Sequence, residues 1–411
     1  MKILRVLSLC CFLSGTFTSL GQNLPSLLSD RNINATFAIM AYDAKAEEWG
    51  VAVATNNIYV GNSTVYIEPG LGAFSVIAET EPSYALEGFR LLREGKSVEE
   101  AILEVKNRDD QANYRQVAGM DAQGNIFAFS GKSLRYWNGM AGEIIGPHYA
   151  VIGNQLADSV LLKMATAFET SQGTLAQRLL ESLVSGQEAG GQLSGKQSAA
   201  LVVKGTKNEW FNQIDLRVDN SKTPITELQT LLDYHYGRIR LNQALYAWRA
   251  GNAQRAHQKM KEAEAMLPGW TGIYPRISRA HILMDNEDRA VIWLKKGLDE
   301  NPNFSTYLPS FYFLREHPEL KSYINPDTFS MTDWESALGM LSNLGREIEL
   351  ISLAKELIAQ QKESSYLHFL LGRSYYYEKE ESKAIKQLEI ALKMDSENIE
   401  ARNLLKKLRP E

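Results

Sequence analysis

Cysteine is almost absent from this sequence. The 411 residues include only two, Cys10 and Cys11, and both lie in an apolar segment at the start of the chain. If that segment is removed as a secretory signal, the remaining chain has no cysteine. Disulfides, cysteine-ligated metal sites and cysteine nucleophiles are then excluded.

Residues 1–21 have the pattern of a secretory signal. Two basic residues precede an apolar stretch over residues 6–17, and the small residues Ser19 and Gly21 follow at the spacing that signal peptidase requires. The alternative, a buried N-terminal helix, leaves both the charged start and the small-residue end unexplained. We therefore expect an exported protein, periplasmic or extracellular, in which residues 22–35 form a leader or propeptide.

Long hydrophobic runs and concentrated charge are also missing. Beyond the first segment no apolar run reaches the roughly eighteen residues of a membrane span. The net charge of −5 and the pI near 5.8 come without a dense basic run, which makes nucleic acid a poor hypothesis. The six histidines are scattered and no phosphate-binding loop is complete, so we predict no metal and no cofactor.

Residues 36–219 alternate between strand and helix patterns. Strands that come in groups, separated by pairs of helices, favour an α+β layered domain over a doubly wound sheet. Ser97, with Glu100 three positions later, is a capping box at the start of one helix. The expected strands are TFAIMAY, WGVAVAT, GLGAFSVIAE, HYAVIGN, KQSAALVV and FNQIDLRV, with a hairpin turned at residues 121–124, and the expected helices are SYALEGFRLLREG, SVEEAILEVKN, 155–171 and 174–185.

Beyond Ser221 the strand pattern stops and a repeat begins. Ala256 matches Ala290, and Pro268 matches Pro302, both pairs at the same spacing. That spacing equals the period of tetratricopeptide repeats, about 34 residues, whose stacked helix pairs bind proteins or peptides. A generic helical bundle is the alternative, but it leaves the shared period to coincidence. We expect an all-α tetratricopeptide-like solenoid with a protein or a peptide as its ligand.

Thr36 stands at the start of the first expected strand and follows the small residue Ala35. A threonine hydroxyl is a weak nucleophile, but it is activated when the residue is the chain's N-terminus and its own α-amine acts as the base. The ordinary pKa of that amine, about 7.7–8.0, suits the task. Threonine is also a common strand residue, so position alone leaves a structural role open.

Six stretches within residues 36–220 follow the pattern of one known family. They are TFAIMAYDAKAEEWGVAVAT, PSYALEGFRLLREGKSVEEAI, RQVAGMDAQGN, VIGNQL, GKQSAALVV and DLRVDN. Through them the segment resembles the N-terminal-nucleophile (Ntn) hydrolases, and within these the domain of unknown function 1028. The resemblance implies a four-layer αββα sandwich, and it implies that Thr36 occupies the position of the nucleophile.

Two positions depart from the pattern of that family. Where the family often has Trp-x-Gly-His, this chain has Met140 after Gly139. An Asn-Pro pair common in the family is Glu81 followed by Pro82 here. If the pocket of the family uses those groups, we expect altered specificity or reduced activity.

Other polar residues in the resembling stretches are candidates for a pocket. Asn154 could present its amide, or a helix N-terminal N–H, to an oxyanion, and a helix cap is the alternative. Asp215, Arg217 and Asp219 share one strand face and could orient a substrate, or they could form an ion-pair ladder. The remaining substrate-binding candidates are Glu79, Glu81, Gln197 and Ser198, with surface or strand-edge positions as alternatives.

These patterns lead to two functional hypotheses. The first is an exported Ntn-type amidohydrolase that cleaves a small amide or peptide through Thr36 and uses its repeats to bind a partner. The second is a non-catalytic secreted binding protein, since a fold does not fix a function.

The expected division of the chain is a signal at 1–21, a leader at 22–35, the Ntn-like domain at 36–220, a linker helix at 221–236, two repeats at 237–304, a connecting segment at 305–330 and further repeats at 331–411.

Overall fold

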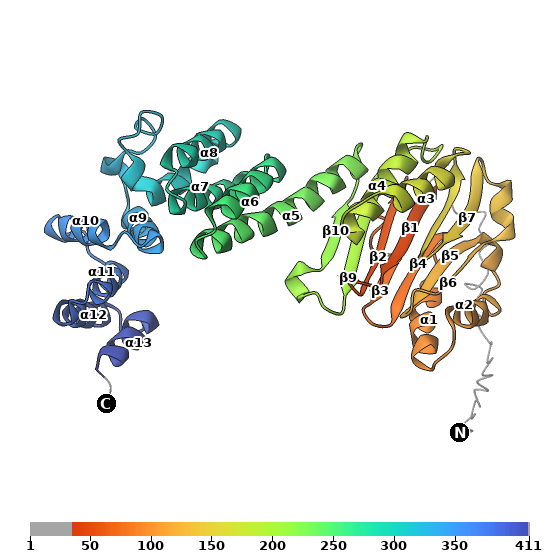
Figure 1. Ribbon diagram of the computed structural model, residues 1–411, viewed down its shortest axis with the longest axis horizontal. Coiled ribbons are helices and arrows are strands. Elements are labelled where there is room, and N and C mark those ends of the chain that lie inside the picture. The colour runs from red at the N-terminus through yellow and green to blue at the C-terminus, as the bar shows by residue number, and fades with distance from the viewer. Residues whose placement is uncertain (1–34, 410–411) are drawn as a thin grey trace, which may run out of the picture. The chain divides into compact units, whose positions relative to one another are not determined.

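The computed structural model describes residues 35–409 (Figure 1). The expected signal at 1–21, with both cysteines, and the leader up to residue 34 lie outside the described residues. The chain divides into two compact units, with the division between Leu231 and Leu232. An N-terminal sheet unit is followed by a helical C-terminal unit, and at this level the expected order of the two folds is confirmed.

Two antiparallel sheets form the N-terminal unit (Figure 1). Every pair of neighbouring strands in both sheets is antiparallel. The six-stranded sheet has the order β10 (Ile214–Val218), β9 (Ser198–Gly205), β2 (Glu48–Thr55), β1 (Thr36–Asp43), β8 (Tyr149–Leu156) and β7 (Met140–Gly146). The four-stranded sheet has the order β3 (Val65–Glu68), β4 (Gly72–Ala78), β5 (Arg115–Asp121) and β6 (Ile126–Ser130).

Each sheet has one face against the other sheet and one face against helices, because side chains alternate along a strand. Met40, Val51 and Ile152 of the six-stranded sheet meet Ile77 and Met120 of the four-stranded sheet in a shared apolar core. The order of layers is therefore helices, sheet, sheet, helices. The helices are α1 (Ser83–Arg93) and α2 (Val98–Lys106) on the four-stranded sheet, and α3 (Val160–Thr170) and α4 (Leu175–Glu188) on the six-stranded sheet.

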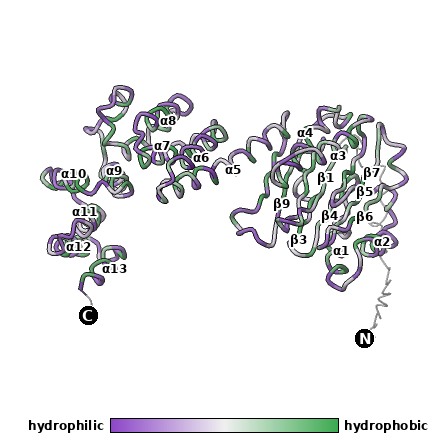
Figure 2. Tube along the Cα trace, viewed as in Figure 1, coloured by the Kyte–Doolittle hydropathy of each residue, from purple (hydrophilic) through white to green (hydrophobic). Residues whose placement is uncertain are grey.

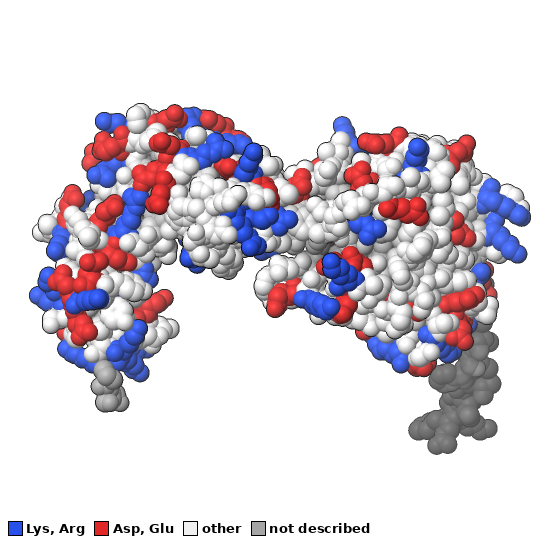
Figure 3. Space-filling view, viewed as in Figure 1, with Lys and Arg blue, Asp and Glu red and all other residues white. Residues whose placement is uncertain are grey.

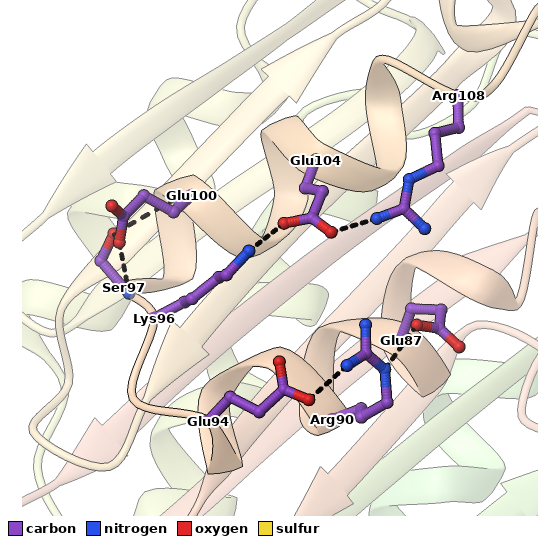
Figure 4. Close-up of polar contacts among 8 residues, drawn as sticks. All are labelled: Glu87, Arg90, Glu94, Lys96, Ser97, Glu100, Glu104 and Arg108. Carbon is purple, nitrogen blue, oxygen red and sulfur yellow. Dashed lines mark hydrogen bonds and ion pairs between the residues drawn. The ribbon is translucent and has the colours of Figure 1, made fainter.

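The capping box expected at the start of α2 is confirmed. The Ser97 hydroxyl accepts a hydrogen bond from the Glu100 N–H at 3.2 Å, and the Glu100 carboxylate accepts one from the Ser97 N–H at 2.8 Å (Figure 4). Along the outer side of the same helix Glu104 pairs with both Lys96 and Arg108. These ion pairs are partly exposed to solvent, so each contributes no more than about 1 kcal/mol.

The structure corrects one helix boundary in this unit and adds two strands. The helix expected to begin at residue 155 begins at Val160, because residues 155 and 156 still belong to strand β8. Strand β8 pairs with β1 on one side and β7 on the other, and this pairing extends it beyond its apolar segment. The sequence pattern also misses β3 and β7. Both are edge strands without fully buried residues, so neither carries a strong apolar signal.

Beyond β10, the regular structure of the described residues is helical. The first helix, α5, runs unbroken from Pro224 to Arg249, across the division between the units. Helices α6, α9 and α10 each begin one repeat period, about 34 residues, before α8, α11 and α12 respectively. The helix bounds are α6 (Ala253–Met266), α7 (Tyr274–Leu283), α8 (Glu287–Glu300), α9 (Met331–Leu344), α10 (Glu347–Ala359), α11 (Ser365–Tyr377), α12 (Glu381–Met394) and α13 (Ile399–Leu408), with a 3₁₀ segment over Pro302–Leu314.

The surfaces of these helices are amphipathic. Hydrophilic and hydrophobic residues alternate along them in Figure 2, and the apolar ones form two buried clusters within the helical unit. Charged side chains of both signs are intermixed on the face shown in Figure 3. Among the described residues, no helix combines the length and the apolar character that a membrane span requires.

Two helical glycines give a matched test of packing in this unit. A Cβ atom on Gly297 of α8 would lie 2.5 Å from Cζ of the fully buried Phe304 ring, whereas one on Gly339 of α9 would have its nearest neighbour at 3.6 Å. We predict that Gly297→Ala lowers the free energy of unfolding by about 1–3 kcal/mol through overpacking. Gly339→Ala should raise it by about 0.4–1 kcal/mol. Denaturant unfolding followed by circular dichroism measures both, and equal effects would contradict the packing described.

Candidate functional site

Four polar residues form a row across the six-stranded sheet, and this polar row consists of Ser198, Thr55, Thr36 and Asn154. Thr55 lies directly opposite Ser198 on one side and Thr36 on the other, and Thr36 in turn lies opposite Asn154. The alternation of the strands points all four side chains toward the four-stranded sheet. All four are buried, and Thr36 is only 5% exposed. Buried polar side chains in such a position are expected to be hydrogen-bonded.

A chain of hydrogen bonds begins at the Thr36 hydroxyl. The Thr55 hydroxyl donates to the carbonyl oxygen of Ala35 at 2.8 Å, since a carbonyl can only accept. The Thr55 hydroxyl has one hydrogen, and the bond to Ala35 occupies it. In the 2.9 Å hydrogen bond between the two threonine hydroxyls, Thr36 is therefore the donor. The Asn56 N–H donates to the same Ala35 oxygen at 3.1 Å. The carbonyl that precedes Thr36 is therefore held by two donors.

The end of strand β2 is fixed by its neighbour β9. The Ser198 hydroxyl donates to the carbonyl of Asn57 at 2.7 Å, and the Gln197 N–H donates to the carbonyl of Thr55 at 2.8 Å. The side chain of Gln197 reaches away from the polar row to Asn220. Ser198 thus belongs to the polar row, whereas Gln197 supports it through its backbone.

Gln116 of strand β5 connects the four-stranded sheet to the polar row. It is fully buried, and its Nε2 lies 2.9 Å from the carbonyl oxygens of both Gly142 and Gly153. Its Oε1 accepts a hydrogen bond from Asn154 Nδ2 at 3.1 Å. Because Asn154 lies within strand β8, it is neither a helix cap nor part of a helix N-terminus.

Two residues with left-handed backbone conformations lie at this same end of the sheets. Ala78, the last residue of β4, has φ = 66°, and Gln155, next to Asn154, has φ = 54°. Such a conformation is uncommon for residues other than glycine, asparagine and aspartate. It costs of order 1–3 kcal/mol and tends to occur near functional sites. The strain therefore coincides with the polar row.

A charged cluster follows strand β4. Arg115 pairs with Asp109 at 2.9 Å and lies 4.0 Å from the carboxylate of Glu79, whose carbonyl also accepts from the guanidinium. Burial raises the pKa of the Asp109 carboxyl, but the hydrogen bonds from Arg115 and the Gln111 N–H outweigh it and hold that pKa below its ordinary value. Burial and the nearby Asp109 raise the pKa of Tyr84. Glu79 thus lies in a structural ion-pair cluster close to Gln116.

The other sequence candidates lie elsewhere. Glu81 accepts from the Ser83 N–H at the start of α1. Asp215 and Arg217 form an exposed ion pair at 2.9 Å on the edge strand β10, which β9 and β2 separate from β1. Asp219 lies just beyond β10 in a surface pocket of about 380 Å³ that Arg217 also lines. The structure therefore brings Thr36, Asn154 and Ser198 together and leaves these four residues outside the polar row.

Residues 35–409 contain no group of three histidine, cysteine, aspartate or glutamate side chains placed to hold a metal ion. The polar row itself consists of hydroxyl and amide side chains. Such groups form hydrogen bonds, and a threonine hydroxyl acts as a nucleophile only where a neighbouring base activates it.

A second buried polar cluster lies in the helical unit. One carboxylate oxygen of Glu264 accepts hydrogen bonds from His281 at 3.0 Å, Arg289 at 2.9 Å and Trp293 at 2.6 Å. Burial raises the pKa of Glu264, but the three hydrogen bonds outweigh it and lower the pKa to about 2. The cluster lines a cavity of about 130 Å³. Its shared acceptor ties α6 to α7 and α8.

The lowered pKa of Glu264 predicts a dependence of stability on pH. The ionised Glu264 carboxylate stabilises the folded state fully above pH 4.5, the ordinary pKa of glutamate. This stabilisation is lost as the pH falls toward about 2. We predict that the difference in unfolding free energy between the native chain and Glu264→Gln narrows by up to about 3 kcal/mol over that range. Urea unfolding at several pH values measures this. The exposed control Glu378→Gln should show no such narrowing, and a parallel response of both variants would refute the cluster's role.

Comparisons with known proteins match the N-terminal unit to one protein family. Residues 36–228 match the model of a family of unknown function, DUF1028. Among solved structures the chain is similar to the crystal structure of protein SPO2555 from Silicibacter pomeroyi, a DUF1028 protein. The two are 31% identical over 48% of this chain and 84% of that chain, with a TM-score of 0.44. No curated protein matches the chain. The family match spans both sheets and the whole polar row.

Proposed function

The chain belongs to the DUF1028 family of unknown function, and from this premise we propose that it is an exported Ntn-type hydrolase that cleaves an amide bond. The observation that carries the proposal is the position of Thr36. It is the first residue of the central strand β1, it is buried between two sheets, and its hydroxyl donates to Thr55. We interpret the layers of helices and sheets as the αββα sandwich of the Ntn hydrolases.

The proposed reaction requires Thr36 to be the first residue of the mature chain. Its hydroxyl oxygen then forms a bond with the substrate's carbonyl carbon while the α-amine accepts the hydroxyl proton. The C–N bond breaks, and the proton passes from the amine to the leaving nitrogen. Water hydrolyses the resulting ester and releases the acid, which returns Thr36 to its starting state.

The contacts of Ala35 support both the removal of the leader and the binding of a substrate carbonyl. Two donors, the Thr55 hydroxyl and the Asn56 N–H, hold the Ala35 oxygen in the intact chain. A carbonyl polarised by two donors is more readily attacked, because the donors stabilise the oxyanion that forms. Once the leader has gone, the same two donors could hold the carbonyl oxygen of a substrate in its place.

The rest of the chain fits a protein that works outside the cytoplasm on a bound partner. We infer export from the signal-like pattern of residues 1–21 and the absence of cysteine beyond them. We interpret the helices that recur at a constant spacing as tetratricopeptide-like repeats, which bind proteins or extended peptides. Their role here would be to bring a peptide or protein partner to the hydrolase.

The alternative is a non-catalytic secreted binding protein. Two observations favour this binding protein. Met140 and Glu81 stand where the family pattern has other residues. The Thr36 hydroxyl is also already hydrogen-bonded to Thr55 in the intact chain. In that case the polar row has a purely structural role. Measurable turnover of an amide substrate would distinguish the hydrolase from the binding protein.

We predict that Thr36→Ala abolishes hydrolysis of amides, acyl-amino acids or cell-wall peptides, because it removes the attacking oxygen. Thr36→Ser keeps that oxygen and should retain measurable turnover. Release of the amine product measures the rates. Equal turnover by both variants would place the chemistry elsewhere, and the absence of turnover in the native, Ser and Ala proteins alike would favour the binding protein.

Thr55→Val should lower kcat by about 10²–10³-fold, the usual cost of losing one oxyanion donor. Valine has nearly the shape of threonine, so packing is preserved. The matched control is Thr64→Val, since Thr64 is also buried but donates to the backbone of Val60. If both variants lose activity equally, the effect of Thr55 lies in folding.

A further inference from the structure

The orientation of two buried amides near Thr36 follows from their partners. Gln116 Nε2 lies at 2.9 Å from two backbone carbonyls, those of Gly142 and Gly153, which can only accept hydrogen bonds. The nitrogen of Gln116 must therefore point at them, and its Oε1 must accept. This oxygen accepts a hydrogen bond from Asn154 Nδ2 at 3.1 Å. Neither amide can be reversed without placing like groups together.

A further hydrogen bond, to Ser130 on strand β6, fixes the orientation of the Gln116 amide. Gln116 Nε2 also lies 2.7 Å from the hydroxyl of Ser130, which in turn donates to the carboxylate of Glu143. The Ser130 hydroxyl points its only hydrogen at the carboxylate, so toward Gln116 it can only accept. The two hydrogens of Nε2 are thus shared among three acceptors, and all three favour the same orientation of the amide.

The result is an oxygen without a partner beside Thr36. Asn154 is fully buried, and its Oδ1 has no hydrogen-bond partner among the residues that the structure describes. Asn154 lies directly opposite Thr36, where facing Cα atoms are about 4.5–5.5 Å apart, and both side chains point to the same face. An unsatisfied buried acceptor costs about 1–3 kcal/mol, so it calls for a donor.

Removal of the leader creates such a donor. Within the intact chain Thr36 has one backbone N–H, but a free α-ammonium has three hydrogens. We propose, on the basis of the hydrolase function above, that Asn154 Oδ1 binds the freed α-amine of Thr36 and that Gln116 is the positioning residue that turns this oxygen toward it. Asn154 then acts as an acceptor and not as the oxyanion donor expected from the sequence.

The inference predicts how the amine titrates. An acceptor favours the charged ammonium, so its loss should move the midpoint of titration to lower pH, and a carboxylate in its place should move it to higher pH. Charged groups on neighbouring elements include Glu143 on β7, Arg115 on β5 and Glu79 after β4. They remain unchanged in every variant compared.

The first test uses the intact chain and needs no free amine. In ¹⁵N-labelled protein, the side-chain amide of Asn154 is identified by its disappearance in Asn154→Asp. We expect Gln116→Met to speed hydrogen exchange of this amide roughly tenfold, as loss of one hydrogen bond would. The matched control is Gln187→Met on α4, on the outer side of the same sheet, which should leave the exchange rate unchanged. An unprotected Asn154 amide in the native chain would overturn the assigned orientation.

The second test measures the amine itself in the chain that begins at Thr36, which keeps every described helix and strand. Periodate oxidises an N-terminal threonine only when its amine is neutral, and mass spectrometry follows the reaction as a function of pH. We expect the midpoint to fall by half a unit or more in Asn154→Leu and Gln116→Met, and to rise by about one unit in Asn154→Asp.

The outcomes separate this inference from the proposed function. Unchanged midpoints in folded Asn154→Leu and Gln116→Met would overturn the inference, even if amide turnover is found. Shifted midpoints without turnover on any amide would support the inference and count against the hydrolase. Circular dichroism confirms folding, and if a variant does not fold, the exchange measurement on the intact chain decides.

Discussion

The hydrogen bond from the Thr36 hydroxyl to Thr55, whose own hydroxyl holds the Ala35 carbonyl in the intact chain, is the interaction on which the site depends. It forms because β1 lies in the centre of the six-stranded sheet, with β2 and β8 on either side. Central strands have all their backbone groups paired, so the threonine is held by the whole sheet. The apolar core between the sheets then excludes water and strengthens each of these bonds.

The polar row is a local exception in an otherwise apolar interface. Burying hydroxyls and amides there gains little stability, since each must exchange water for a protein partner. Two left-handed residues at the same end add strain. An unpartnered Asn154 oxygen, backbone strain and buried hydroxyls occur together here, and the proposed hydrolase function accounts for this combination. The Glu264 cluster of the helical unit differs, because its shared acceptor is fully used.

The sequence predicted what depends on local pattern and missed what depends on pairing. The apolar alternation after Thr36 and the Ser97 capping box follow from neighbouring residues, and both are found. The pairing of β1 with β2 brings Thr55 to Thr36, and the packing of the two sheets brings Gln116 to Asn154, so neither contact follows from neighbouring residues alone. A single polar residue inside the apolar stretch RQVAGMD was the one available signal for Gln116. Asp215 and Arg217 do share a face, but strand order places them at the edge.

The N-terminal residue of the protein exported from its own host tests the central claim most directly. Edman degradation and intact mass give it without any assumption about the substrate. The account predicts a mature chain that begins at Thr36, with its α-amine free beside Asn154. A stable mature chain that begins at Gln22, or at any other residue before Thr36, would contradict it, because the amine would remain in a peptide bond.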